Sequence, residues 1–259
     1  MGVQTAVQVM HEAIEAHGGM DYWNRLGALE VAISARGFLF RAKRRPALNR
    51  VHMLASTKEP RLALLDFPRS GECAELIGSS EVRILDRKGT VVARRANPRQ
   101  AFRGFRRQFF WDDLDFIYFA GYAIWNYLTA PFLLARQGFL VEILEPLHGP
   151  LEHVTRLQVT FPEDVPTHSR RQLFYFNEQR LLRRLDYTAE VVGGWAHAAH
   201  LCEGYRTFDR LSAPTRRRVL PLLFGHGPLP GPTLVEIDVH DIRPVPASAV
   251  QDFTRRTET

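Results

Sequence analysis

The chain has 259 residues, 45% of them hydrophobic and 24% charged, so it is long enough to bury a substantial core and has an ordinary globular composition. Its net charge is +6, but the arginines are spread through every segment, which argues against the single basic face of a nucleic-acid-binding protein and leaves peripheral contact with an anionic membrane surface open. Two cysteines, Cys73 and Cys202, are too few for a disulfide framework, so we expect free thiols in the cytoplasm, and no apolar run reaches the roughly 18 residues of a membrane-spanning helix.

The first segments predict one helix followed by a run of short strands. Val7, Met10 and Ile14 recur at helical spacing, which indicates a helix over residues 4–16, and Gly18-Gly19 ends it. Apolar and polar residues then alternate with the period of a half-buried strand. We expect strands at residues 29–35, 48–56, 61–67, 73–78, 81–86 and 90–95. Gly89 lies in the hairpin turn between the last two strands, where a positive φ is useful.

The middle of the chain, residues 100–137, changes to helical periodicity and is crowded with aromatic side chains. Asp112 is the expected N-cap of a helix, and Asp113 and Asp115 lie in its first turn, where the helix dipole favours negative charge. Helix capping, rather than metal binding, therefore explains these acidic residues. Pro131 ends or kinks the helix. Because so many large rings cannot be left in water, we expect this helix to fill the concave face of a sheet.

The strand pattern resumes after this helix. We expect strands at residues 154–161, 172–177, 180–188, 195–208, 215–221 and 233–243, a loop at 226–232 and a polar tail over about 247–259. Successive antiparallel strands joined by turns indicate a mainly β fold of the α+β class. We expect one curved antiparallel sheet, or open half-barrel, with an N-terminal helix and a central aromatic helical plug. Residues 1–259 are expected to form a single domain.

Three segments resemble the outer-membrane lipoprotein carriers of the LolA/LolB-like class. They are AHGGMDYW after the first helix, the hairpin LFYFNEQRLLRRLDY, and FDRLSAPTRRRV near the last strands. The resemblance implies an open, half-closed barrel that holds a hydrophobic ligand such as an acyl chain. This sequence departs from the carriers because it begins MGVQTAVQVMHEAIEAHGG, without a signal peptide or lipobox cysteine. We therefore expect a cytoplasmic relative with a different cargo.

The segment from Asp186 to Tyr205 carries more side chains that can move protons than a strand that only closes a sheet needs. Residues two apart on a strand share a face, so His200 and Cys202 lie on one face and His197 lies on the other. The alanines beside His200 favour it as the inward-facing histidine. The candidate catalytic residues are His200 or His168 as base, Asp186 as its orienter, Tyr187 as a donor to developing charge, and Glu190. The alternative is a hydrogen-bonded core histidine, with Asp186 paired to a neighbouring arginine.

Metal binding and ligand binding are the other interpretations of these residues. His168, His197 and His200, with Glu190 or Cys202, would supply three metal ligands, but no HExxH or CxxC spacing supports this, so we predict no metal and no cofactor. Within the aromatic helix, several residues with polar tips recur at spacings of three and four, which favours a pocket wall over plain core packing. The predicted ligand-binding residues are Trp111, Tyr118, Tyr122, Trp125, Asn126, Trp195 and Cys202.

These patterns predict a protein that binds a hydrophobic small molecule or lipid in a barrel cavity. The alternative is an enzyme, of isomerase or cyclase type or using other acid–base chemistry, that acts on an apolar substrate in the same cavity. A structural or interaction protein without a ligand is the third interpretation.

Overall fold

The structure is a computed structural model that describes residues 5–145, 153–223 and 227–250. Its helices are α1 (Ala6–Ala16), α2 (Met20–Arg25), α3 (Phe38–Ala42), α4 (Pro98–Ala101) and α5 (Asp113–Thr129), with short 3₁₀ helices η1 (Phe105–Gln108) and η2 (Phe132–Ala135). The strands are β1 (Leu26–Arg36), β2 (Leu48–Ser56), β3 (Arg61–Leu65), β4 (Cys73–Ile77), β5 (Glu81–Leu85), β6 (Val91–Ala96), β7 (Leu140–Leu144), β8 (Thr155–Thr160), β9 (Arg171–Phe176), β10 (Leu182–Thr188), β11 (His197–Phe208), β12 (Leu211–Pro221) and β13 (Val235–Pro246).

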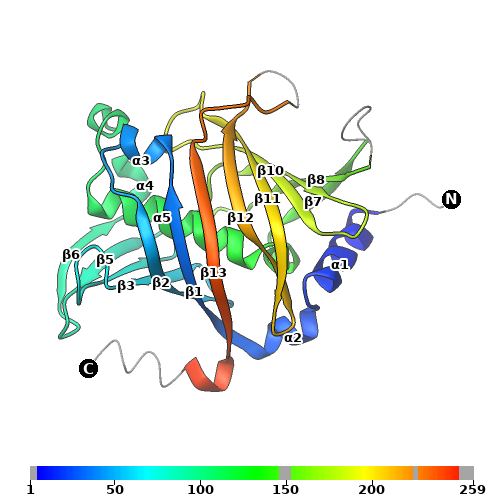
Figure 1. Cartoon of the computed structure of the whole chain (residues 1–259), viewed down its shortest axis with the longest axis horizontal. Coiled ribbons are helices and arrows are strands. Elements are labelled where there is room, and N and C mark those ends of the chain that lie inside the picture. The colour runs from blue at the N-terminus through cyan, green and yellow to red at the C-terminus, as the bar shows by residue number, and fades with distance from the viewer. Residues whose placement is uncertain (1–4, 146–152, 224–226, 251–259) are drawn as a thin grey trace.

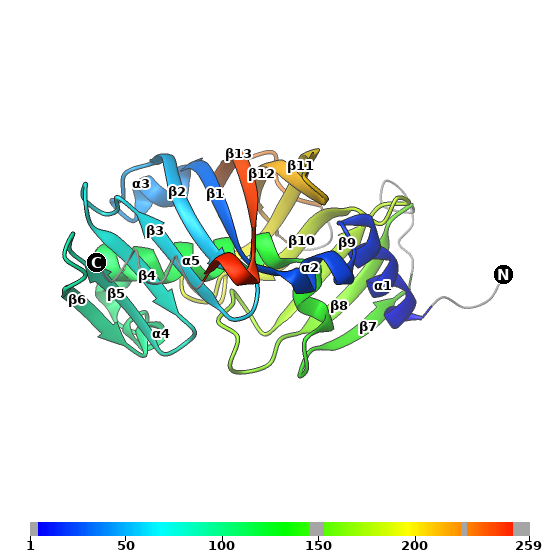
Figure 2. The same cartoon turned by 90° about the horizontal axis from the view of Figure 1, so that it is seen from below.

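All of these strands belong to one antiparallel 13-stranded sheet in the order β6-β5-β4-β3-β2-β1-β13-β12-β11-β10-β9-β8-β7. The first strand pairs with the last, so β1 and β13 join two meanders at the middle of the sheet. The sheet curves around α5, and its two edges, β6 and β7, do not meet (Figures 1 and 2). The predicted open half-barrel with a central helical plug is therefore confirmed.

The helix α5 is held at both ends by side chains. At its N-terminus, Asp112 is the N-cap, as predicted, and it also forms a reciprocal capping box with Asp115. Arg95 donates to both carboxylates, at 2.9 Å to Asp112 Oδ1 and 2.6 Å to Asp115 Oδ1. At its C-terminus, the carbonyl of Tyr127 has no helical donor because the residue four positions on is Pro131, which lacks an N–H. Arg217 supplies the missing donor at 2.7 Å.

The sequence patterns located most elements and missed three. The first helix begins after Thr5, whose side chain caps it, and ends before Gly18, as predicted. Strand β7 was not expected, because it is an edge strand of five residues without a buried face. The short helices α2 and α3 were also missed. The predicted tail is helical at 247–250, and its remainder lies outside the described residues, as does part of the predicted 226–232 loop. Among the helices that the structure describes, none is long and apolar enough to cross a membrane.

Candidate functional site

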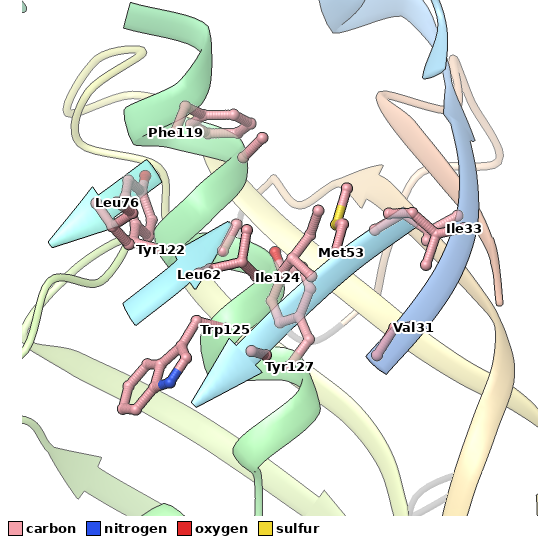
Figure 3. Packing of buried hydrophobic residues seen from close by; sticks show 14 of the residues in the cluster. Val31, Ile33, Met53, Leu62, Leu76, Phe119, Tyr122, Ile124, Trp125 and Tyr127 are labelled. Atoms are coloured by element: carbon pink, nitrogen blue, oxygen red, sulfur yellow. The ribbon is translucent and has the colours of Figure 1, made fainter. Parts of the chain in front are cut away.

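One side of α5 packs closely against the N-terminal half of the sheet. Gly121 lies so near β4 that a Cβ added to it would be 3.0 Å from the Cβ of Leu76. On the same side, the Trp125 indole is buried and donates to the Ser56 carbonyl at 2.8 Å. Figure 3 shows Tyr122 and Trp125 on this side of the helix, with Tyr122 beside Leu76, and Ile124 and Tyr127 on the other.

The other side of α5 borders a cavity of about 310 Å³, which falls in the size range of small-molecule sites. The helix contributes Ala120, Ala123 and Ile124 to the wall. Strands β1, β11, β12 and β13 contribute Ala35, Ala198, Val219 and Ile237 from the facing side, and α3 covers one end. Because most of these side chains are small or aliphatic, the cavity offers a largely apolar surface. Alanines on both walls leave the space that larger residues would fill.

The mouth of the cavity is formed by exposed apolar side chains, which we call the mouth residues: Phe38, Trp195 and Leu223. Their exposed fractions are 46%, 74% and 58%, although each also lines the cavity. The neighbouring element η1 contributes Gln108 to the wall. Exposed apolar residues that border an apolar cavity are typical of a ligand entrance or an interaction surface.

The surroundings of the mouth are basic. Residues 37–50 and 97–111, which contain α3 and η1, include nine Lys or Arg residues and no Asp or Glu. Lys43 is buried and lines the cavity, and its ammonium donates to the carbonyls of Arg107 at 3.1 Å and Gln108 at 2.6 Å. Burial lowers the pKa of Lys43. Arg41 and Arg106 are exposed on the same segments.

A chain of hydrogen bonds runs into the cavity wall. The two ring nitrogens of His168 face tyrosine hydroxyls: Nδ1 lies 3.1 Å from Tyr122 and Nε2 lies 2.7 Å from Tyr127. The Tyr127 hydroxyl is also 2.9 Å from that of Tyr187. The His168 and Tyr187 rings stack with centroids 4.1 Å apart. Three of the four residues, all except Tyr122, line the cavity.

The environment keeps the side chains of this hydrogen-bonded group electrically neutral. Burial, with a contribution from the nearby Arg99 charge, lowers the pKa of His168 to about 3. Burial also raises the pKa values of Tyr127 and Tyr187 above the ordinary value for tyrosine. Arg99 fixes the loop that carries His168 by donating to the carbonyls of Thr167 at 2.7 Å and His168 at 3.2 Å. The group can therefore exchange hydrogen bonds with a ligand, but His168 is not poised to take up a proton near neutral pH.

His200 points into the core, as strand parity predicted, but it lies behind the cavity wall. Arg217 approaches its Nε2 at 3.4 Å and Cys202 Sγ at 3.4 Å, and the ring of Tyr127 packs edge-on at 4.3 Å. Burial, followed by the charge of Arg217, lowers the pKa of His200 well below its ordinary value. Neither His200 nor Cys202 contributes to the cavity wall, whereas Trp195 and Tyr187 do.

The predicted pair of Asp186 and His200 is not formed. Asp186 lies opposite Ala199, whereas His200 lies opposite Leu185, so the two side chains are on opposite faces of the sheet. The Asp186 carboxylate instead accepts hydrogen bonds from Tyr175 at 2.7 Å and from Arg184 at 2.5 and 2.8 Å. This is the arginine pairing that the sequence left as the alternative.

The other predicted site residues are also separated. Glu190 is half-exposed and pairs with Arg99 at 2.5 Å, and His197 bonds Thr188 at 2.9 Å near the mouth. Within the described ranges, no three His, Cys, Asp or Glu side chains converge in an arrangement that could hold a metal ion. The residues predicted as a pocket wall on the aromatic helix, together with the tryptophan before it, lie away from the cavity; they are Trp111, Tyr118, Tyr122, Trp125 and Asn126.

The sequence interpretation missed the residues of α5 that do line the cavity, including Phe119, Ala120, Ala123 and Tyr127. Their spacing of three and four was visible, and so were the two alanines among large rings. Both faces of the helix are apolar, however, and the polar tips of Tyr118 and Tyr122 drew the prediction to the opposite face. Lys43 was missed because α3 was not expected.

No family model and no curated protein sequence matches this chain. Solved structures similar to it include a LolA superfamily protein and a DUF1329 family protein. A LolA superfamily protein from Nitrosomonas europaea is 15% identical, with a TM-score of 0.54 over 97% of this chain and 100% of that one. A DUF1329 family protein from Desulfovibrio piger ATCC 29098 is 12% identical, with a TM-score of 0.50 over 93% of this chain and 94% of that one. The chain therefore has a LolA-like fold, as the sequence resemblance implied.

Proposed function

We propose that this chain, which has a LolA-like fold, binds one hydrophobic small molecule or lipid in the cavity beside α5. The observation that carries the proposal is the cavity itself: about 310 Å³ of space between apolar walls, open at a mouth of exposed apolar side chains. Transfer of an apolar molecule from water into an interior of this kind lowers the free energy of the system. A tightly packed core would leave no such space.

The proposal is tested by titrating the purified protein with N-phenyl-1-naphthylamine, a neutral apolar fluorophore. We expect saturable fluorescence enhancement at one site. Ala123→Phe places a ring in the cavity and is expected to abolish the enhancement while circular dichroism stays unchanged. Ala96→Phe is the matched control, because it adds the same ring at an exposed position on β6. Equal binding by the two variants would contradict the proposal.

We further propose that the mouth contacts an anionic membrane surface from which the ligand enters. Exposed aromatic residues partition to a membrane interface, and the exposed arginines of the two neighbouring segments complement anionic headgroups. They are Arg41, Arg44, Arg50, Arg103 and Arg106. We expect the protein to co-sediment with vesicles that contain phosphatidylglycerol, and less of it to co-sediment with vesicles of phosphatidylcholine alone. The double variant Phe38→Ser, Trp195→Ser should lose binding, whereas Val92→Ser removes an exposed apolar side chain from β6 and should not. Retained binding by the double variant would refute this contact.

The enzyme alternative uses the same cavity for a substrate, and it stays a prediction. His168 is its remaining candidate base at the cavity wall, because His200 lies behind that wall. Loss of turnover in His168→Ala, with the fold intact, would support it once a substrate is known. The cytoplasmic location also stays a prediction.

A further inference from the structure

The hydrogen bonds from Tyr122 through His168 and Tyr127 to Tyr187 form a chain with one end in the core and the other at the cavity. Tyr122 is fully buried and does not line the cavity, whereas Tyr187 does. His168 is the only hydrogen-bond partner that the described residues give the Tyr122 hydroxyl. The direction of the bonds along this chain therefore decides which end has a hydrogen to spare.

Counting hydrogens limits the arrangements. Three hydroxyls and one neutral imidazole supply four donor hydrogens, but only three contacts join the four groups. If every contact is a hydrogen bond, one hydrogen remains unused, because the imidazole donates once and a tyrosine oxygen can accept two hydrogen bonds. It belongs to Tyr122, in the core, or to Tyr127 or Tyr187, which both line the cavity.

Burial decides between the two ends. A spare hydrogen on Tyr122 would be a buried donor without an acceptor, which costs roughly 1–3 kcal/mol. When Tyr122 donates to His168 Nδ1 instead, Nε2–H donates to Tyr127, and one hydrogen bond joins Tyr127 and Tyr187 in either direction. The unused hydrogen then belongs to one of these two tyrosines at the cavity wall, where a ligand atom can accept it.

We infer that the Tyr127–Tyr187 pair donates a hydrogen bond to an uncharged oxygen of the ligand, so that the cavity selects an apolar molecule with a carbonyl, ether or hydroxyl oxygen. This inference rests on the proposed binding function and adds the chemical class of the ligand. A neutral oxygen fits because the wall near Tyr187 is built from neutral side chains, including His168, Ala189 and Ala198. The ammonium of Lys43, the cation in the described wall, already donates to two backbone carbonyls beside η1.

The test uses two fluorophores that differ only at one oxygen. The first is 6-propionyl-2-(dimethylamino)naphthalene, whose carbonyl emission shifts to the red when it accepts a hydrogen bond. The second is 6-propyl-2-(dimethylamino)naphthalene, in which a methylene replaces the carbonyl. We expect the double variant Tyr127→Phe, Tyr187→Phe to weaken binding of the ketone by about tenfold and shift its emission to the blue, and to leave binding of the propyl compound unchanged.

Tyr118→Phe is the matched control, because it removes the hydroxyl of another buried tyrosine that does not line the cavity. It should leave both affinities unchanged. The inference is overturned if the double variant weakens both fluorophores equally or neither, or if Tyr118→Phe weakens the ketone to the same extent. If the unmodified protein binds neither compound, the proposed binding function fails, and that outcome is distinct from a loss of discrimination between the two.

Discussion

The two sides of α5 have similar apolar sequences and very different surroundings. Toward β3 and β4, Gly121 lets the helix approach until its backbone almost touches Leu76. Toward β11 and β12, Ala120 and Ala123 leave a cavity instead of contacts. Because Gly121 has no side chain, the helix can lie close to β4. Because Ala120 and Ala123 have small side chains, space remains between the helix and the opposite part of the sheet. Residue size, rather than hydrophobicity, thus distinguishes the core of this protein from its cavity.

His168 connects the two sides, because it bonds Tyr122 from the packed side and Tyr127 from the cavity side. Acid should break this connection. The pKa values of His17, His168 and His200 are lowered on folding, to about 4, to about 3 and well below 6.5. The unfolded chain therefore binds more protons below pH 6.5, and stability falls as pH falls. From pH 7 to 5 we expect the free energy of unfolding to drop by about 2 kcal/mol per histidine, or about 6 kcal/mol together.

Urea denaturation at pH 7 and pH 5 measures this loss. The pH range stays above the ordinary pKa of carboxylates, so histidines dominate it. His168→Gln removes one titrating group and should reduce the pH-dependent loss by about a third. Equal stability at the two pH values would mean that the buried histidines are protonated at little cost, and that they do not hold the two sides of α5 together.

A pair of identical truncations compares the two sides directly. Leu76 is fully buried against Gly121, and Leu48 is buried but lines the cavity. Leu76→Ala is expected to lower the free energy of unfolding by about 3–5 kcal/mol, as in a close-packed core. Leu48→Ala should lower it by only about 1–2 kcal/mol, because its side chain already lacks neighbours on one side. Chemical denaturation of both variants checks the difference, and equal losses would show that the cavity is not an open space.

The sequence predicted the sheet better than the site for a physical reason. Alternation with period two fixes both a strand and its inward face, so β2 was placed at its observed bounds and His200 was correctly pointed inward. To decide whether residues on two neighbouring strands share a face, the pairing register of the strands must also be known. The register of β10 and β11 places Asp186 and His200 on opposite faces, and the sequence pattern does not give it. On α5 both faces are apolar. The periodicity therefore located the helix but could not say which face meets the sheet, and two tyrosines that are buried in the core were assigned to the pocket wall.

The smallest expected effect comes from adding volume to the two sides of α5 with the same side chain. Gly121→Leu forces the helix away from Leu76 and should cost about 1–3 kcal/mol of unfolding free energy, because backbone and strand must move apart. Ala123→Leu extends into open space and should change stability by less than about 0.5 kcal/mol. Binding of N-phenyl-1-naphthylamine should respond in the opposite order, with Ala123→Leu weakening it and Gly121→Leu affecting it less. A stability loss in Ala123→Leu equal to that in Gly121→Leu would mean that both sides are packed. A crossed result, in which each variant affects one property, would show that the space beside α5 is kept for a ligand rather than for stability.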